Sequence, residues 1–291
     1  MNITLNNEKI STNKITCKGK IKIIEHHNIK YVFKTNNRCN NNNIYDYLES
    51  RNFKYYPKII EQNNNYTISE YQEEYDIPIE QKILDLIDLV SLLHSKTVQY
   101  KSVTEDIYKE IYEKLENQIN DIYIMLNEKI TLIETKIFMS PSEYLLARNI
   151  SKLYGSLMYS KNLLDKWYEL VKNKKQIRKV LVHNNLKIEH FIKNKSSYLI
   201  NWDKSDIDMP IIDLYQLYIN HNLEFDFENL ISHYEKKFPL LKEEKMLFMV
   251  LISIPILHET NDKEYRNCLY ITKYIDSINN SENIILKYNS K

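Results

Sequence analysis

Residues 181–217, LVHNNLKIEHFIKNKSSYLINWDKSDIDMPIIDLYQL, constrain the fold more than any other part of the chain. His183 stands at the start of a polar loop, and the run Lys-Asn-Lys-Ser that follows it indicates a turn. A short apolar strand is expected at 198–200, ending in Asn-Trp-Asp. Pro210 then interrupts the regular structure, and Asp213 lies at the start of the next expected helix. The segment therefore predicts a polar loop placed between short strands and a helix.

This order of residues resembles the catalytic segment of the aminoglycoside phosphotransferase and choline kinase family, kinase-like proteins that phosphorylate small molecules. The family pattern is HGDLHxxNxL, then IDWE or IDFE, then a DP..DL segment. The resemblance implies a bilobal α+β fold, with a small antiparallel β-sheet lobe and a larger helical lobe. In chain order it places the loop histidine at His183, the catalytic Asp at Asn185, the metal-binding Asn at His190, the metal-binding Asp at Asn201, the trailing acid at Asp203 and the Asp of the final DL at Asp213.

Three of these positions carry a different chemistry from the family's. Phosphoryl transfer uses an Asp that accepts the hydroxyl proton, and an Asp and an Asn that hold magnesium against the phosphates. The amide of Asn185 can orient a hydroxyl but cannot take its proton. Mg²⁺ prefers anionic oxygen ligands, whereas Asn201 offers a neutral carbonyl and His190 a nitrogen better suited to zinc or copper. We therefore expect a catalytically degenerate member, a pseudokinase, and the kinase-like spore-coat proteins of Firmicutes resemble it most.

Two alternatives for metal binding stay open. If residues 198–203 form a strand, Asn201 and Asp203 project from the same face, and Asp203 could serve as a substitute metal ligand. His183, His190 and Asp203 could instead bind zinc, although their spacing is not specific for it.

Structural roles are expected for two of the matched residues. The resemblance implies that His183 braces the catalytic loop through hydrogen bonds. Asp213 follows Pro210 at a helix start, where a carboxylate can cap free backbone amides. In the family the same Asp also ties down the catalytic loop.

The N-terminal region predicts a β-rich lobe. β-branched residues alternate or cluster in short runs separated by polar turns, with one helix among them. This order resembles the small lobe of the kinase-like fold, placed at residues 1–72. The expected strands cover 13–17, 20–24, 29–34, 57–60 and 66–70, and the helix covers 44–52.

Within this lobe, Lys34 ends the strand that carries the phosphate-pairing lysine of the family. Asp46 and Glu49 are the acids available as its helical partner, and the alternative is a strand-end lysine in water. Kinases cover the phosphates with a Gly-rich loop because only glycine allows so close a backbone approach. Here Gly19 stands alone. The resemblance places the hinge at about 70–75, where Glu70 and Tyr71 would present backbone groups to an adenine.

Residues 76–291 predict a helical lobe. Apolar residues recur at helical spacing from residue 79 onward. Ser140, Pro141 and Glu143 form a capping-box start signal. A helical insert is expected at 105–177, either shaping a substrate pocket or serving as plain scaffold, and three further helices are expected at 226–238, 241–258 and 262–279.

Composition narrows the function classes. The 40 basic and 39 acidic residues of the 291 leave a charge of +1, so there is no overall attraction to nucleic acid or to anionic membrane. One basic run, at 172–179, is expected to be a solvated helix end. Three scattered cysteines predict no disulfide framework and suit the cytoplasm. No secretory signal is expected, and the longest apolar run, 246–257, is too short to span a bilayer.

Three functions are consistent with these features. The first is a pseudokinase, cytoplasmic or spore-associated, with a nucleotide, small-molecule or protein partner. The second is an active, divergent ATP- and Mg-dependent phosphotransferase on a small hydroxyl compound, with Lys34 on the phosphates and Asp203 on the metal. The third, a plain helical interaction module, requires the match over 181–217 to be a coincidence.

Overall fold

The computed structural model describes residues 4–5, 8–9, 14–18, 21–26, 29–35, 44–63, 65–255 and 263–289. The chain forms two compact units. The first unit combines residues 1–97 with 181–207, and the second combines 98–180 with 208–291. The segment 181–207 therefore belongs with the N-terminal sheet. The predicted lobe boundary near residue 75 stays a prediction.

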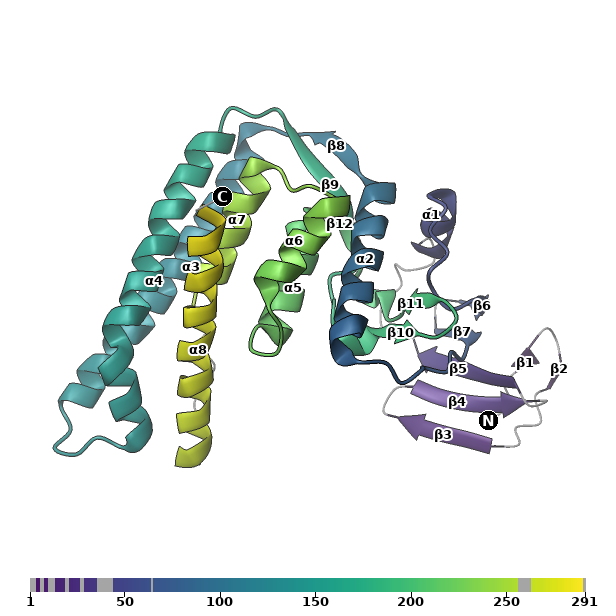
Figure 1. Ribbon diagram of the computed structural model, residues 1–291, viewed down its shortest axis with the longest axis horizontal. Coiled ribbons are helices and arrows are strands. Elements are labelled where there is room, and N and C mark those ends of the chain that lie inside the picture. The colour runs from purple at the N-terminus through teal and green to yellow at the C-terminus, as the bar shows by residue number, and fades with distance from the viewer. Residues whose placement is uncertain are drawn as a thin grey trace. The chain divides into compact units, whose positions relative to one another are not determined.

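A five-stranded antiparallel sheet forms the first unit's N-terminal part, in the order β3-β4-β5-β7-β6 (Figure 1). Alternation along the strands buries Ile24, Phe33 and Ile68 in one cluster, against which Tyr31 and Tyr66 pack. The five predicted strands are confirmed within a few residues. They are β3 (Lys14–Lys18), β4 (Ile21–His26), β5 (Ile29–Thr35), β6 (Ile59–Gln62) and β7 (Tyr66–Glu70), and a separate pair is formed by β1 (Thr4–Leu5) and β2 (Glu8–Lys9).

Two helices and a hairpin complete the first unit. Helix α1 (Ile44–Ser50) agrees with the prediction, and α2 (Ile79–Thr97) buries the apolar face expected from its spacing. The predicted turn joins β10 (Phe191–Lys193) to β11 (Ser197–Leu199), which pair antiparallel. Two 3₁₀ turns flank this hairpin, η1 (Ile188–His190) and η2 (Trp202–Lys204).

The second unit is mostly helical. Helix α4 (Pro141–Val171) packs against α3 (Glu105–Glu134), α7 (Lys242–Ser253) and α8 (Glu264–Asn289), and α5 (Ile211–His221) packs against α7. Helix α6 (Phe227–Lys237) precedes α7. Strand β8 (Gln99–Ser102) pairs antiparallel with β9 (Gln176–Val182). The short strand β12 (Asp206–Asp208) precedes α5 in the chain.

The predicted start of α4 is confirmed. Ser140 is the N-cap and accepts a hydrogen bond from the Glu143 amide, while the Glu143 carboxylate accepts one from the Ser140 amide at 2.9 Å. Pro141 occupies the first turn, where its missing N–H costs nothing. The sequence signal was sufficient here because the two residues of the capping box lie three residues apart.

Two expectations need correction. The basic run is a helix end only in part: Lys172 is the C-cap of α4, but Arg178 lies in β9, 8% exposed, and its Nε donates to Glu244 Oε1 at 2.9 Å. Residues 198–203 do not form one strand, because β11 ends at Leu199 and the chain turns through η2. Among the described residues no helix is long and apolar enough to cross a membrane.

Candidate functional site

Lys34 is the centre of a polar cluster inside the first unit. It pairs with Ile21 and Thr67 on the neighbouring strands of the sheet, one residue after the buried Phe33. Because side chains alternate along a strand, Lys34 points to the face opposite Phe33. Its Nζ forms a hydrogen bond to Asn201 Oδ1 and an ion pair with Asp203 Oδ2. Lys34 is therefore not an isolated strand-end lysine in water.

The turn after β11 delivers both partners to Lys34. Asn201 adopts a left-handed conformation with φ of 70°, which asparagine tolerates better than most residues. Trp202 is buried, its Nε1 donates to the Leu199 carbonyl at 2.9 Å, and its ring lies edge-on to Phe53. The tryptophan anchors the turn. Asn201 and Asp203 reach one ammonium group through this tight turn rather than through the pleat of a strand.

His190 holds Asn201 in a defined orientation. Its Nδ1 lies 2.7 Å from the Asn185 carbonyl, which only accepts, so Nδ1 carries the proton. Its Nε2 then accepts from Asn201 Nδ2 at 3.0 Å, which agrees with Oδ1 of the same amide facing Lys34. Burial lowers the pKa of His190 below its ordinary value, and this favours the neutral ring that the geometry requires.

We call the resulting series, from the Asn185 carbonyl through His190 and Asn201 to Lys34 and Asp203, the lysine chain. Each of its members is joined to the next by a hydrogen bond or an ion pair. Such chains polarise their members and fix side-chain positions. The lysine chain joins Lys34 on β5 to residues 185–203, which lie far away in the sequence.

His183 lies beneath the same loop. It is fully buried, and its Nε2 lies 2.8 Å from the Ile200 carbonyl, so Nε2 donates. Its ring packs edge-on against Trp202 at a centroid distance of 5.0 Å. The histidine thus ties the start of the loop to the end of the hairpin. Asn185 itself is half-buried in the loop.

The acids of α1 have other environments. Glu49 Oε1 accepts from the Tyr56 hydroxyl at 3.2 Å, whereas the acid paired with Lys34 is Asp203.

Burial raises the pKa of Tyr45 above its ordinary value, and the charge of Asp203 raises it further. Tyr45 was not singled out from the sequence, because nothing in its neighbourhood along the chain marks it.

The backbone amides at the predicted hinge are used within the chain. The Glu70 amide donates to the Lys58 carbonyl at 2.9 Å, and the Tyr71 amide donates to the Lys30 carbonyl at 3.0 Å. An adenine contact from Glu70 or Tyr71 would therefore come from a carbonyl or a side chain. Gly19, expected at the phosphate loop, lies outside the described residues.

Asp213 lies in the second unit, in the first turn of α5, and is fully buried. Pro210 is the N-cap of this helix, so Asp213 is its third residue. A carboxylate at this position is stabilised by the positive end of the helix dipole. In the part of the chain that the structure describes, no group of three or more His, Cys, Asp or Glu side chains could hold a metal ion, which removes the expected zinc alternative.

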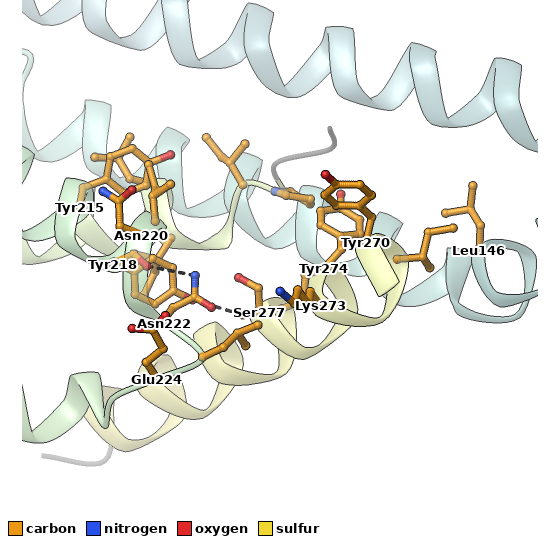
Figure 2. A pocket seen from close by; sticks show the side chains of 18 of the residues that line it. Leu146, Tyr215, Tyr218, Asn220, Asn222, Glu224, Tyr270, Lys273, Tyr274 and Ser277 are labelled. Atoms are coloured by element: carbon orange, nitrogen blue, oxygen red, sulfur yellow. Dashed lines mark hydrogen bonds between the residues drawn. The ribbon is translucent and has the colours of Figure 1, made fainter. Parts of the chain in front are cut away.

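A separate cavity of about 430 Å³ lies within the second unit (Figure 2). Tyr270 and Tyr274 follow one another along α8, and α5 contributes Tyr215 and Tyr218. Most of the lining is apolar, and its size falls in the range of small-molecule pockets. Its charged lining groups are Lys129, Lys273 and Glu224, a balance that does not favour a polycation.

Known structures resemble the whole chain. An aminoglycoside phosphotransferase from Alicyclobacillus acidocaldarius aligns with a TM-score of 0.73 and 9% identity, over 99% of this chain and 96% of that one. An AMP-bound spectinomycin phosphotransferase aligns with a TM-score of 0.59 and 13% identity, over 94% and 93%. A choline kinase from Streptococcus pneumoniae aligns with a TM-score of 0.50 and 17% identity, over 91% and 95%.

These similarities establish the fold. The chain has the kinase-like fold of aminoglycoside phosphotransferases and choline kinases, with a small antiparallel sheet and a larger helical part. The third alternative, a plain helical module, is therefore wrong. No protein-family model matches the chain, and no curated protein matches it either.

Proposed function

We propose that this chain is a pseudokinase of the phosphotransferase fold, which binds a nucleotide at Lys34 and transfers phosphate slowly or not at all. The lysine chain carries the proposal. In the family's pattern a base, a metal and a lysine act on one phosphate. Here His190 and Asn201, at the metal positions, are hydrogen-bonded to one another and to Lys34, and His190 also bonds to the backbone carbonyl of Asn185.

Three observations support nucleotide binding. Lys34 is held on a central strand and its side chain is 23% exposed. Among the described residues its three N–H groups meet two acceptors, which leaves one N–H for a phosphate oxygen. The spectinomycin phosphotransferase neighbours were solved with AMP and with ADP. Because Asp203 already balances the charge of Lys34, we expect weak binding, with dissociation constants toward the millimolar range.

Slow transfer follows from Asn185. An amide can orient a substrate hydroxyl, but it cannot accept the proton that the hydroxyl loses. General-base catalysis typically contributes a factor of about 10² to 10⁴, so its loss alone removes most of the rate.

The test combines binding with turnover. A nucleotide that binds only the folded chain raises its thermal stability by mass action. We expect ATP or ADP to stabilise the wild type and Lys54→Ala, an exposed-lysine control, but not Lys34→Ala. ADP production should stay at the rate without protein. Equal shifts in all three proteins would contradict the assignment of Lys34.

The second candidate is an active, divergent phosphotransferase on a small hydroxyl compound. The tyrosine-lined cavity favours it, because its volume suits a small molecule. A screen of small hydroxyl compounds with ATP and Mg²⁺ separates the two candidates. Substrate-dependent ADP release that is lost in Lys34→Ala supports the enzyme.

The proposal extends to the location and the partner of this chain. A degenerate member that resembles the spore-coat kinase-like proteins would act in the cytoplasm or on the spore, with a protein partner in assembly. The position of Asn185, Asn201 and His190 in one hydrogen-bonded network supports a role in which the site is kept folded rather than turned over.

A further inference from the structure

Magnesium does not fit the donor groups of this site. The resemblance places the family's metal-binding Asn and Asp at His190 and Asn201, with Asp203 as a substitute ligand, and Mg²⁺ needs several oxygen ligands in near-octahedral geometry. His190 Nε2 has its lone pair directed at the Asn201 amide, 3.0 Å away. Asn201 Oδ1 and Asp203 Oδ2 both accept from Lys34. A metal ion would have to break the lysine chain and would then gain a single carboxylate.

We propose that the ammonium group of Lys34 takes the place of the metal ion, so that this site binds nucleotide phosphates without any divalent cation. The inference rests on the proposed function. The inference adds the identity of the group that neutralises the phosphates, which is the Lys34 ammonium and not a metal ion.

The geometry of the three partners carries this assignment. Asn201, at a metal position, and Asp203, the substitute ligand, both direct an oxygen at the Lys34 ammonium, as they would at a metal cation. His190 fixes the Asn201 amide so that its oxygen, not its nitrogen, faces that charge. The ring nitrogen of His190, at one metal position, thus orients the neutral amide of Asn201 toward the Lys34 ammonium. The replacements at the two metal positions, His190 and Asn201, therefore both suit Lys34 better than magnesium.

Replacing Asp203 tests the inference, because binding through magnesium and binding through Lys34 predict opposite changes in nucleotide affinity. If magnesium bridges the carboxylate and the phosphates, Asp203→Asn removes a metal ligand and weakens nucleotide binding. If Lys34 binds the phosphates directly, Asp203 is a nearby negative charge that competes with them for the same ammonium. Asp203→Asn should then tighten binding. Asp203 is 52% exposed, so the variant is expected to fold.

The experiment titrates ATP into the full-length protein by calorimetry, once with EDTA and once with Mg²⁺. For the wild type we expect dissociation constants that agree within about twofold, and for Asp203→Asn a tighter constant in EDTA by about three- to tenfold. Asp206→Asn removes the charge of another exposed carboxylate, which has no contact with Lys34 among the described residues, and serves as the matched control, with wild-type affinity expected.

A restored donor set completes the test. The double variant His190→Asn and Asn201→Asp brings back the two metal-binding residue types of the family pattern. We expect it to bind ATP at least about tenfold more tightly with Mg²⁺ than with EDTA.

Wild-type binding that appears only with Mg²⁺, and is lost in Asp203→Asn, would overturn the inference and leave the nucleotide site in place. No binding of ATP under either condition would overturn the proposed nucleotide site, and the inference with it.

Discussion

Asparagine does at single positions what glycine usually does in loops. The chain has two glycines. Among the described residues the non-glycine positions with positive φ are Asn52, Asn184 and Asn201, at 53°, 54° and 70°. Asparagine tolerates this region because its short amide can bond locally. Two of these residues flank the candidate site, so its loops depend on asparagine for their backbone as well as for their side chains.

Replacing Asn201 by Gly or by Ala separates these two contributions. Both variants lose the bonds to Lys34 and His190, but only alanine is strained at a φ of 70°. We expect Asn201→Ala to be less stable than Asn201→Gly by about 1 kcal/mol in urea unfolding. The same pair at Asn52, which lies outside the lysine chain, should show a similar difference. Equal stability of the two Asn201 variants would contradict a strained backbone.

His183 should matter for stability. Removing its ring leaves the Ile200 carbonyl without this donor and opens space beside Trp202. We expect His183→Ala to lower the free energy of unfolding by about 2 to 4 kcal/mol. His183→Gln keeps an N–H at similar reach and should recover part of the loss. An alanine variant as stable as the wild type would show that the bracing contact is unimportant.

At the scale of elements, a buried ion pair fastens the sheet of the second unit to its helices. The guanidinium of Arg178 on β9 pairs with Glu244 on α7, donates to the Pro239 carbonyl at 2.9 Å and lies 4.3 Å from the centre of the Phe238 ring. Glu244 also accepts from the Leu241 amide at 2.9 Å, and so caps its own helix. Burying such a pair costs desolvation free energy. Removing one partner alone is strongly destabilising, because the other charge is then left buried and unpaired.

Glu244→Ala should therefore destabilise the chain by about 3 to 5 kcal/mol in urea unfolding, because it leaves a buried, unpaired guanidinium. Arg178→Met combined with Glu244→Leu should lose less than the sum of the single variants. Glu113→Ala breaks the exposed pair with Lys109, which are 3.7 Å apart, and should change stability by less than about 1 kcal/mol. A cost for Glu244→Ala as small as that of the exposed control would contradict this account.

The start of α4 should depend on pH. The Lys136 ammonium and the Ser140 amide lower the pKa of Glu143 below its ordinary 4.5. A lowered folded-state pKa stabilises the fold above the unfolded value, and this contribution disappears as pH falls through the folded value. Glu143→Gln keeps the hydrogen-bonding shape but has no charge. The stability advantage of the wild type over Glu143→Gln should be full at neutral pH and vanish in acid, whereas an advantage independent of pH would contradict it.

Local signals predicted the elements better than the site. Strand alternation, helical spacing and the capping box at Ser140 each depend on residues near one another in sequence, and these predictions are confirmed. Strands β8 and β9 were missed, because Arg178 and its neighbours resemble a basic helix end unless the distant Glu244 is known. The partners of Lys34 were missed for the same reason, since Asn201 lies 167 residues away. The left-handed turn at Asn201 had a local signal, an asparagine directly after an apolar strand.

At the scale of the molecule, the fold is that of phosphotransferases, whereas the side chains of the candidate site favour the proposed pseudokinase. The chain has the fold of phosphotransferases over nearly its full length. Yet the Asn185 carbonyl, His190 and Asn201 form a hydrogen-bonded series that ends at Lys34, which also pairs with Asp203. A fold does not by itself establish an activity, because activity depends on the groups in the site.

The most direct test of this account follows the phosphorus resonances of ATP by NMR with the purified protein, Mg²⁺ and a set of small hydroxyl compounds. The account predicts that the ATP resonances shift or broaden in a manner that depends on Lys34, while ADP appears no faster than without protein. Stoichiometric formation of ADP and a new phosphate-ester resonance would show an active phosphotransferase and contradict the central claim.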